Sequence, residues 1–136
     1  MSYADEASRR RWANRDVALD RLRRRVRGRI DLSQDCGPPP GWIGAFEDLA
    51  LDAMRMLPKS AMAEIAVARA ERGRLRVAWR ASGVEDVEVL HALAERFRRA
   101  EDACRSMCEE CGQEGALTCT PSWSRILCAT HAEQAE

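Results

Sequence analysis

The stretch from residue 108 to 131, CEECGQEGALTCTPSWSRILCATH, decides the fold of the C-terminal quarter of this chain. It holds two paired motifs, Cys-x-x-Cys at 108–111 and Cys-x-x-His at 128–131. A two-residue gap lets a tight turn aim both side chains at one ion, and Zn²⁺ binds four such ligands in a tetrahedron. We therefore predict a structural Zn²⁺ site. Its predicted ligands are Cys108, Cys111, Cys128 and His131.

The residues around these pairs predict a small finger over 108–136. Gly112 follows the second cysteine, where a knuckle needs a permissive backbone. Two short strands are expected on either side of the Thr-Pro-Ser turn at 120–122, and a helix after Cys128. Knuckle, hairpin and helix together predict a treble-clef-like zinc finger. Cys104 and Cys119 are close enough in the sequence to replace one of the four ligands.

The ligand set indicates a structural metal. Four protein ligands leave no open coordination position for a water or substrate. The only other histidine is His91, and no phosphate-binding loop or nucleophile motif is present. Glu109 and Glu110, inside the first pair, are interpreted as solvated. We expect no enzyme activity and no small-molecule substrate.

Upstream of the finger, residues 43–107 predict a small α+β body. Apolar periodicity indicates a helix over 43–57 and another over about 84–107. Between them, alternating residues on both sides of Gly73 predict a β-hairpin. The preceding stretch, 31–42, contains three consecutive prolines and two glycines and is interpreted as a linker that ends at a buried Trp42.

Residues 1–30 predict one long Arg-rich helix with a narrow apolar seam, which suits a coiled coil or a helix laid across a body. Docking of this seam on a protein partner or on a second copy is one hypothesis, and packing on the protein's own body is the alternative. The predicted partner-binding residues are Trp12, Leu19, Leu22 and Val26, with Ile30 continuing the stripe.

Charge is unevenly distributed along a chain of zero net charge. Residues 1–30 hold ten arginines and four acidic residues, so the remainder is acidic. A basic helix of this kind favours nucleic-acid binding as the alternative function, and outward arginines at 74, 76 and 80 would add a second basic row. The predicted nucleic-acid-binding residues are Arg9, Arg10, Arg11, Arg21, Arg23, Arg24, Arg25 and Arg27.

The composition also sets expectations about location. No apolar run approaches the roughly 20 residues that span a bilayer, and the N-terminus lacks the apolar core of a secretory signal. Six cysteines without an export signal favour metal ligation over disulfides. We expect a cytoplasmic protein that has no membrane partner.

Three segments together resemble a family of small uncharacterised bacterial and phage proteins. They are GPPPGW at 37–42, GRLRVAW at 73–79 and MCEECGQEGALTCTPSWSRILCATHAE at 107–133. The resemblance covers roughly 37–134 and implies the same finger and the same four metal ligands, but no known activity. The chain departs from the family at Ser122-Trp123, where Gly-Trp is usual, and in its Arg-rich N-terminal helix.

The phage association of that family implies a role such as inhibition of a host defence complex, as anti-CRISPR proteins do. The function expected first is therefore a non-catalytic, zinc-stabilised protein-interaction module, with nucleic-acid binding as the alternative. Salt dependence separates the two, because phosphate contacts weaken steeply with added salt.

Overall fold

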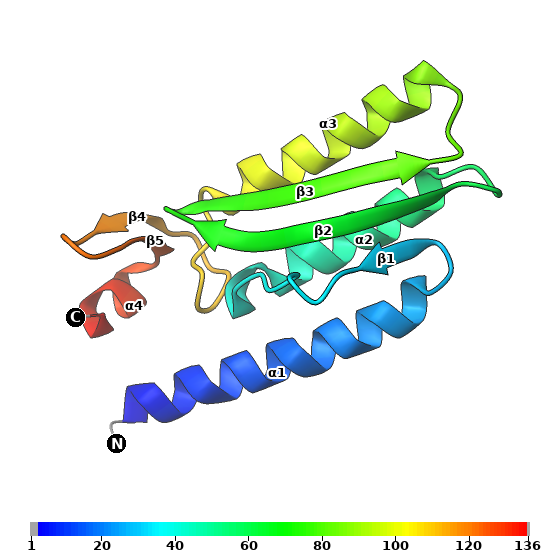
Figure 1. Ribbon diagram of the computed structural model, residues 1–136. Coiled ribbons are helices and arrows are strands. Elements are labelled where there is room, and N and C mark those ends of the chain that lie inside the picture. The colour runs from blue at the N-terminus through cyan, green and yellow to red at the C-terminus, as the bar shows by residue number, and fades with distance from the viewer. Residues whose placement is uncertain (1–2, 136) are drawn as a thin grey trace.

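The computed structural model describes residues 3–135 and is an α+β fold, as the sequence predicts (Figure 1). Its elements follow one another as α1 (Tyr3–Val26), β1 (Ile30–Leu32), a 3₁₀ turn η1 (Pro40–Trp42), α2 (Ile43–Met56), β2 (Met62–Glu71), β3 (Arg74–Ser82), α3 (Val87–Cys104), β4 (Ala116–Cys119), β5 (Ser124–Leu127) and α4 (Ala129–Gln134).

A three-stranded sheet of order β1-β2-β3 forms the centre of the body. The predicted hairpin is confirmed, with β2 and β3 antiparallel and turning at 72–73. Helices α2 and α3 pack on one face of the sheet (Figure 1). On that face Trp79 of β3 stacks on Phe97 of α3 with ring centroids 4.5 Å apart. Alternation along β3 accounts for this, because every second side chain faces the helices.

The proline-rich stretch is tied to the sheet along its length. Leu32 pairs with Ile65 in a parallel β1–β2 ladder that the sequence analysis missed. Further along, the Gly37 N–H donates to the Ala68 carbonyl at 2.7 Å. The stretch ends at Trp42, which is fully buried and donates from its indole Nε1 to the Met107 carbonyl at 2.7 Å. Prolines fit here because the segment lies at an edge of the sheet, where few backbone N–H donors are needed.

Helix α1 ends at Val26, four residues before the predicted end. Gly28 has a φ of 84°, and the Arg29 N–H donates to the Val26 carbonyl at 3.0 Å, which closes the last turn. A left-handed glycine at this place is the usual helix stop. The chain then reverses into β1, so that α1 runs back alongside the body (Figure 1).

The apolar seam of α1 faces its own body, which is the alternative that the sequence left open, so Leu19, Leu22 and Val26 are not exposed for docking on a partner. Leu19, Leu22 and Val26 are at most 3% exposed and belong to the same core as Ile30 and Phe46. Burying a large aliphatic side chain stabilises a fold by about 1.5–3 kcal/mol, which favours internal packing over exposure. Trp12 lies outside this core, half-buried, with the Arg15 guanidinium 4.7 Å from its ring centroid.

Candidate metal centre

The structure brings together the four predicted ligands. The ligand atoms of Cys108, Cys111, Cys128 and His131 all lie within 4.8 Å of one another, so this group could bind a metal ion. The first two come from the loop after α3. The third occupies the N-cap position of α4, and the histidine lies in the first turn of that helix.

Three of the distances between ligand atoms are close to the edges of a tetrahedron. With metal–sulfur bonds of about 2.3 Å and a metal–nitrogen bond of about 2.0–2.1 Å, ideal edges are about 3.8 Å between sulfurs and about 3.5 Å from sulfur to nitrogen. Cys111 Sγ lies 3.8 Å from Cys128 Sγ. His131 Nδ1 lies 3.5 Å from Cys108 Sγ and 3.2 Å from Cys128 Sγ. These spacings suit a group that could bind one metal ion, with Nδ1 as the imidazole ligand.

The knuckle has the predicted backbone. Gly112 has a φ of 81° and donates its N–H to the Cys108 carbonyl at 2.8 Å, which closes the turn around the first ligand pair. The knuckle also packs against the proline-rich stretch, where the Gly41 N–H donates to the Glu109 carbonyl at 2.8 Å. The ligand loop is thus held from within and from the body.

Glu109 is 4% exposed, so the interpretation of this side chain as solvated is wrong. Its carboxylate accepts the Ile126 backbone N–H at 2.6 Å, and its Oε1 lies 3.7 Å from Arg125 Nε. Burial raises the pKa of Glu109, while the backbone hydrogen bond and Arg125 oppose that rise. The side chain joins the knuckle to strand β5.

Glu110 is 8% exposed, and it too was wrongly interpreted as solvated. Its carboxylate lies 2.9 Å from Arg125 Nη2 and 3.2 Å from Arg11 Nε, and it accepts the Ser8 hydroxyl at 3.2 Å. Burial alone would raise the pKa of Glu110, but the hydrogen bonds from Arg125 and Arg11 outweigh it and hold the pKa below its usual value. We call this set the α1 clasp, because it ties the N-terminal half of α1 to the finger.

The two cysteines considered as substitute ligands lie outside the group. Cys104 is fully buried in the core, and burial raises the pKa of its thiol to about 12. Cys119 lies exposed on β4. Burial also raises the pKa of Cys111 to about 11, and a bound metal would reverse this effect because a coordinated thiol is deprotonated.

The arginines of α1 divide into two groups. Arg11 belongs to the α1 clasp, and Arg23 donates to the Ser33 carbonyl at 3.1 Å and to Asp20 at 3.4 Å. Arg21 lies 3.6 Å from Glu47. Five others are exposed and form no ion pair with the described side chains of residues 6–135: Arg9, Arg10, Arg24, Arg25 and Arg27.

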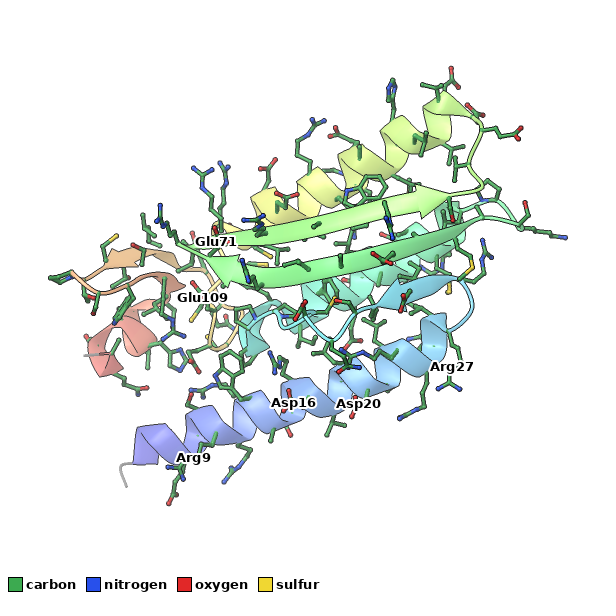
Figure 2. The ribbon with its side chains drawn as sticks, in the orientation of Figure 1. Arg9, Asp16, Asp20, Arg27, Glu71 and Glu109 are labelled. Carbon is green, nitrogen blue, oxygen red and sulfur yellow. The ribbon has the colours of Figure 1, made fainter. Side chains whose placement is uncertain are left out.

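The acidic residues of α1 are used locally. Asp16 pairs with Arg15, and Asp20 with Arg23 (labelled with Arg9 and Arg27 in Figure 2). These two carboxylates therefore pair with Arg15 and Arg23, which also donate to carbonyls of the body. They do not pair with the five exposed arginines given above. Local sequence does not separate the two groups, because Arg11 and Arg23 contact residues that lie farther along the chain.

No helix in residues 3–135 has the length and apolar character needed to cross a membrane. Comparison of the chain with protein-family models, with curated proteins and with solved structures gave no match.

Proposed function

We propose that the protein is a non-catalytic binding module stabilised by a structural Zn²⁺. The closed set of three sulfurs and one nitrogen supports this, because four protein ligands at tetrahedral distances leave no place for a reacting water. The two carboxylates between Cys108 and Cys111 in the sequence also already have hydrogen-bond partners. Glu109 holds a backbone N–H, and Glu110 holds two arginines.

We propose further that the binding partner is a nucleic acid contacted through the outward face of α1. The observation that carries this is the set of five exposed arginines given above, which form no ion pair with the side chains described in residues 6–135. Arginine gives bidentate, charge-assisted hydrogen bonds to phosphate oxygens, and several on one helix supply a sequence-independent affinity. The narrower expectation, a phage inhibitor of a host defence complex, stays a prediction, and the buried seam removes the docking surface on which it relied.

Elemental analysis and native mass spectrometry of the purified protein test the metal. We expect one Zn²⁺ per chain, and its loss in Cys111→Ser. Cys119→Ser is the matched control, because this exposed thiol lies outside the ligand group and its variant should keep the ion. One full equivalent of zinc in Cys111→Ser would refute the ligand assignment.

A salt titration of nucleic-acid binding tests the partner. Replacing Arg24, Arg25 and Arg27 with alanine should weaken binding and lower the slope of log K against log salt by about 2–3, because each lost phosphate contact removes nearly one released counterion. The control removes the same charge elsewhere, at Lys59, Arg98 and Arg99, which are all exposed. Equal binding by both variants would argue against α1 as the contact surface.

A further inference from the structure

The turn of the β2–β3 hairpin carries a residue type that its backbone does not favour. Arg72 has a φ of 53° and Gly73 a φ of 77°, so both central residues are left-handed. Two-residue turns with this geometry prefer asparagine or glycine at the first position, and left-handed backbone is uncommon for other residues. Residues held in disfavoured backbone conformations cluster at functional sites, so the Arg72 side chain is a candidate for a binding role.

Arg72 stands at the edge of a cleft of about 530 Å³ between the hairpin end and the last turn of α3. Four arginines and two glutamates line it, together with one leucine: Arg72, Arg74, Arg76, Arg105, Glu71, Glu101 and Leu75. The floor is supplied by Leu75, which is 2% exposed, and the arginines are exposed around it.

The carboxylates of the cleft do not neutralise most of its arginines. Glu71, labelled in Figure 2, lies 3.4 Å from both Arg76 and Arg69. Arg72, Arg74 and Arg105 form no ion pair with the side chains described in residues 6–135. Three arginines that line this cleft therefore lack an ion pair with a described carboxylate, and Glu101 is the acidic residue whose charge Arg105 feels.

We propose that this cleft binds phosphate groups of a nucleic-acid backbone. The cleft is a second contact site, distinct from α1. This inference rests on the proposed function and adds a second surface that binds the phosphates. Guanidinium groups match phosphate oxygens in geometry as well as in charge. A bound phosphate would balance the excess of positive charge that four arginines and two glutamates leave in the cleft.

A neighbouring cleft places an aromatic side chain near the proposed phosphate site. Arg72 also lines a second cleft of about 410 Å³, between α1, the hairpin and the finger, whose wall includes the half-buried Trp12. Two glutamates, Glu109 and Glu110, share this wall and pair with Arg125, so this cleft is not a second site for phosphate. Its contribution is the indole ring, because proteins that bind single strands stack bases on aromatic side chains beside the phosphate contacts.

The test measures binding of a fluorescent single-stranded oligonucleotide to the intact, zinc-loaded protein. The variant Arg72→Ala, Arg74→Ala, Arg105→Ala should bind it roughly tenfold or more weakly, since hydrogen bonds to charged groups are lost. The charge-matched variant Lys59→Ala, Arg98→Ala, Arg99→Ala should bind like the wild type. Equal weakening in both variants would overturn the site, because a general loss of charge would then explain it.

Arg72→Asn separates binding from folding. Asparagine suits the left-handed turn, so this variant should melt no lower than the wild type and still bind the oligonucleotide more weakly. Unchanged affinity would refute the role of Arg72. Competition distinguishes the sources of phosphate: an unlabelled oligonucleotide should displace the probe at far lower phosphate concentration than pyrophosphate does, and displacement by polyglutamate at equal charge would overturn the proposal.

The two proposals fail in different ways. If the α1 variant weakens binding and the hairpin variant does not, the cleft is refuted while the α1 contact stands. If no variant and no wild-type protein retains the oligonucleotide, the proposed nucleic-acid partner itself is refuted.

Discussion

Gly41 occupies a position where no side chain fits. A Cβ built on it would lie 1.9 Å from the Cys108 carbonyl oxygen and 2.6 Å from the Gly112 nitrogen, and both are backbone atoms of the metal knuckle. Backbone cannot move aside as a flexible side chain can. This glycine therefore sets how closely the proline-rich stretch and the ligand loop approach each other.

We predict that Gly41→Ala lowers the free energy of unfolding by roughly 1–3 kcal/mol or more, as overpacking does. Gly44→Ala is the matched control, because a Cβ there meets nothing within 4 Å and the position lies in α2. The control should gain about 0.5 kcal/mol from helix propensity. Denaturant unfolding of zinc-loaded protein measures both, and similar stability of the two variants would contradict this account.

Leu22 and Val17 differ in burial on the same helix. Leu22 is 1% exposed and Val17 is 63% exposed. Leu22→Ala should cost about 2–5 kcal/mol of stability because it leaves a cavity in the core, whereas Val17→Ala should stay within about 0.5 kcal/mol of the wild type. Denaturant unfolding of both variants tests whether the seam of α1 serves its own fold. A small effect at Leu22 would restore the idea of an exposed docking seam.

At the scale of elements, the α1 clasp joins two ends of the chain that are about a hundred residues apart in sequence. Glu110 lies between two metal ligands and contacts Ser8 and Arg11 of α1 and Arg125 of the finger. The C-terminal half of α1 is fastened differently, by apolar packing in the core. The two halves of this helix therefore depend on different parts of the molecule.

Glu110→Ala should destabilise the protein by on the order of 2 kcal/mol, because two arginines lose a charged acceptor. Hydrogen exchange should quicken in the N-terminal half of α1 and stay slow around Leu22. Glu114→Ala is the control, since this side chain is exposed and lies in the same loop region. Uniform exchange along α1 in the Glu110 variant would show that the clasp does not hold the helix.

Asp52 and Arg96 link α2 to α3 through an ion pair with 2.9 Å between Oδ2 and Nε. The hydrogen bond from Arg96 is the main cause that lowers the pKa of Asp52. A carboxyl whose pKa is lowered by folding stabilises the fold above its unfolded pKa, near 4, and this contribution is lost as pH falls through the folded value. The pair should therefore stabilise the helix layer at neutral pH and make its stability fall as the pH drops below about 4.

Asp52→Asn should reduce the fall in melting temperature that occurs as the pH drops below about 4, compared with the wild type. The control is Asp48→Asn, because Asp48 is an exposed neighbour in α2 that has no ion pair among the described side chains. This variant should lose melting temperature below about pH 4 as the wild type does. Thermal unfolding followed across this pH range provides the measurement. If the melting temperature falls equally below about pH 4 in all three proteins, the pair does not contribute to the pH dependence of stability.

At the scale of the whole molecule, one core joins α1, the sheet, α2 and α3, and the finger adds to it chiefly Ile126. The body can therefore keep its packing when the metal is removed. After chelation we expect the finger and the N-terminal half of α1 to exchange rapidly, while the sheet and α3 stay protected. Hydrogen exchange with and without a chelator tests this, and a cooperative loss of all protection would contradict it.

Local pattern was enough to predict several elements and the four ligand positions. The hairpin around Gly73 follows from alternation, α2 and α3 from their apolar period, and the knuckle from a two-residue ligand spacing. Each of these features is set by residues near one another in the sequence. Periodicity does not say which surface covers an apolar stripe, and so the sequence left open whether the seam of α1 packs on a partner or on its own body.

The sequence by itself determined the four candidate metal ligands and the α+β class, because residue spacing over short distances encodes both. Only the tertiary structure decided the burial of Glu109 and Glu110, the pairing of β1 with β2, and which arginines of α1 pair with the body. Those outcomes depend on contacts between distant segments, such as Arg11 with Glu110, and such contacts exist only once the whole chain has packed.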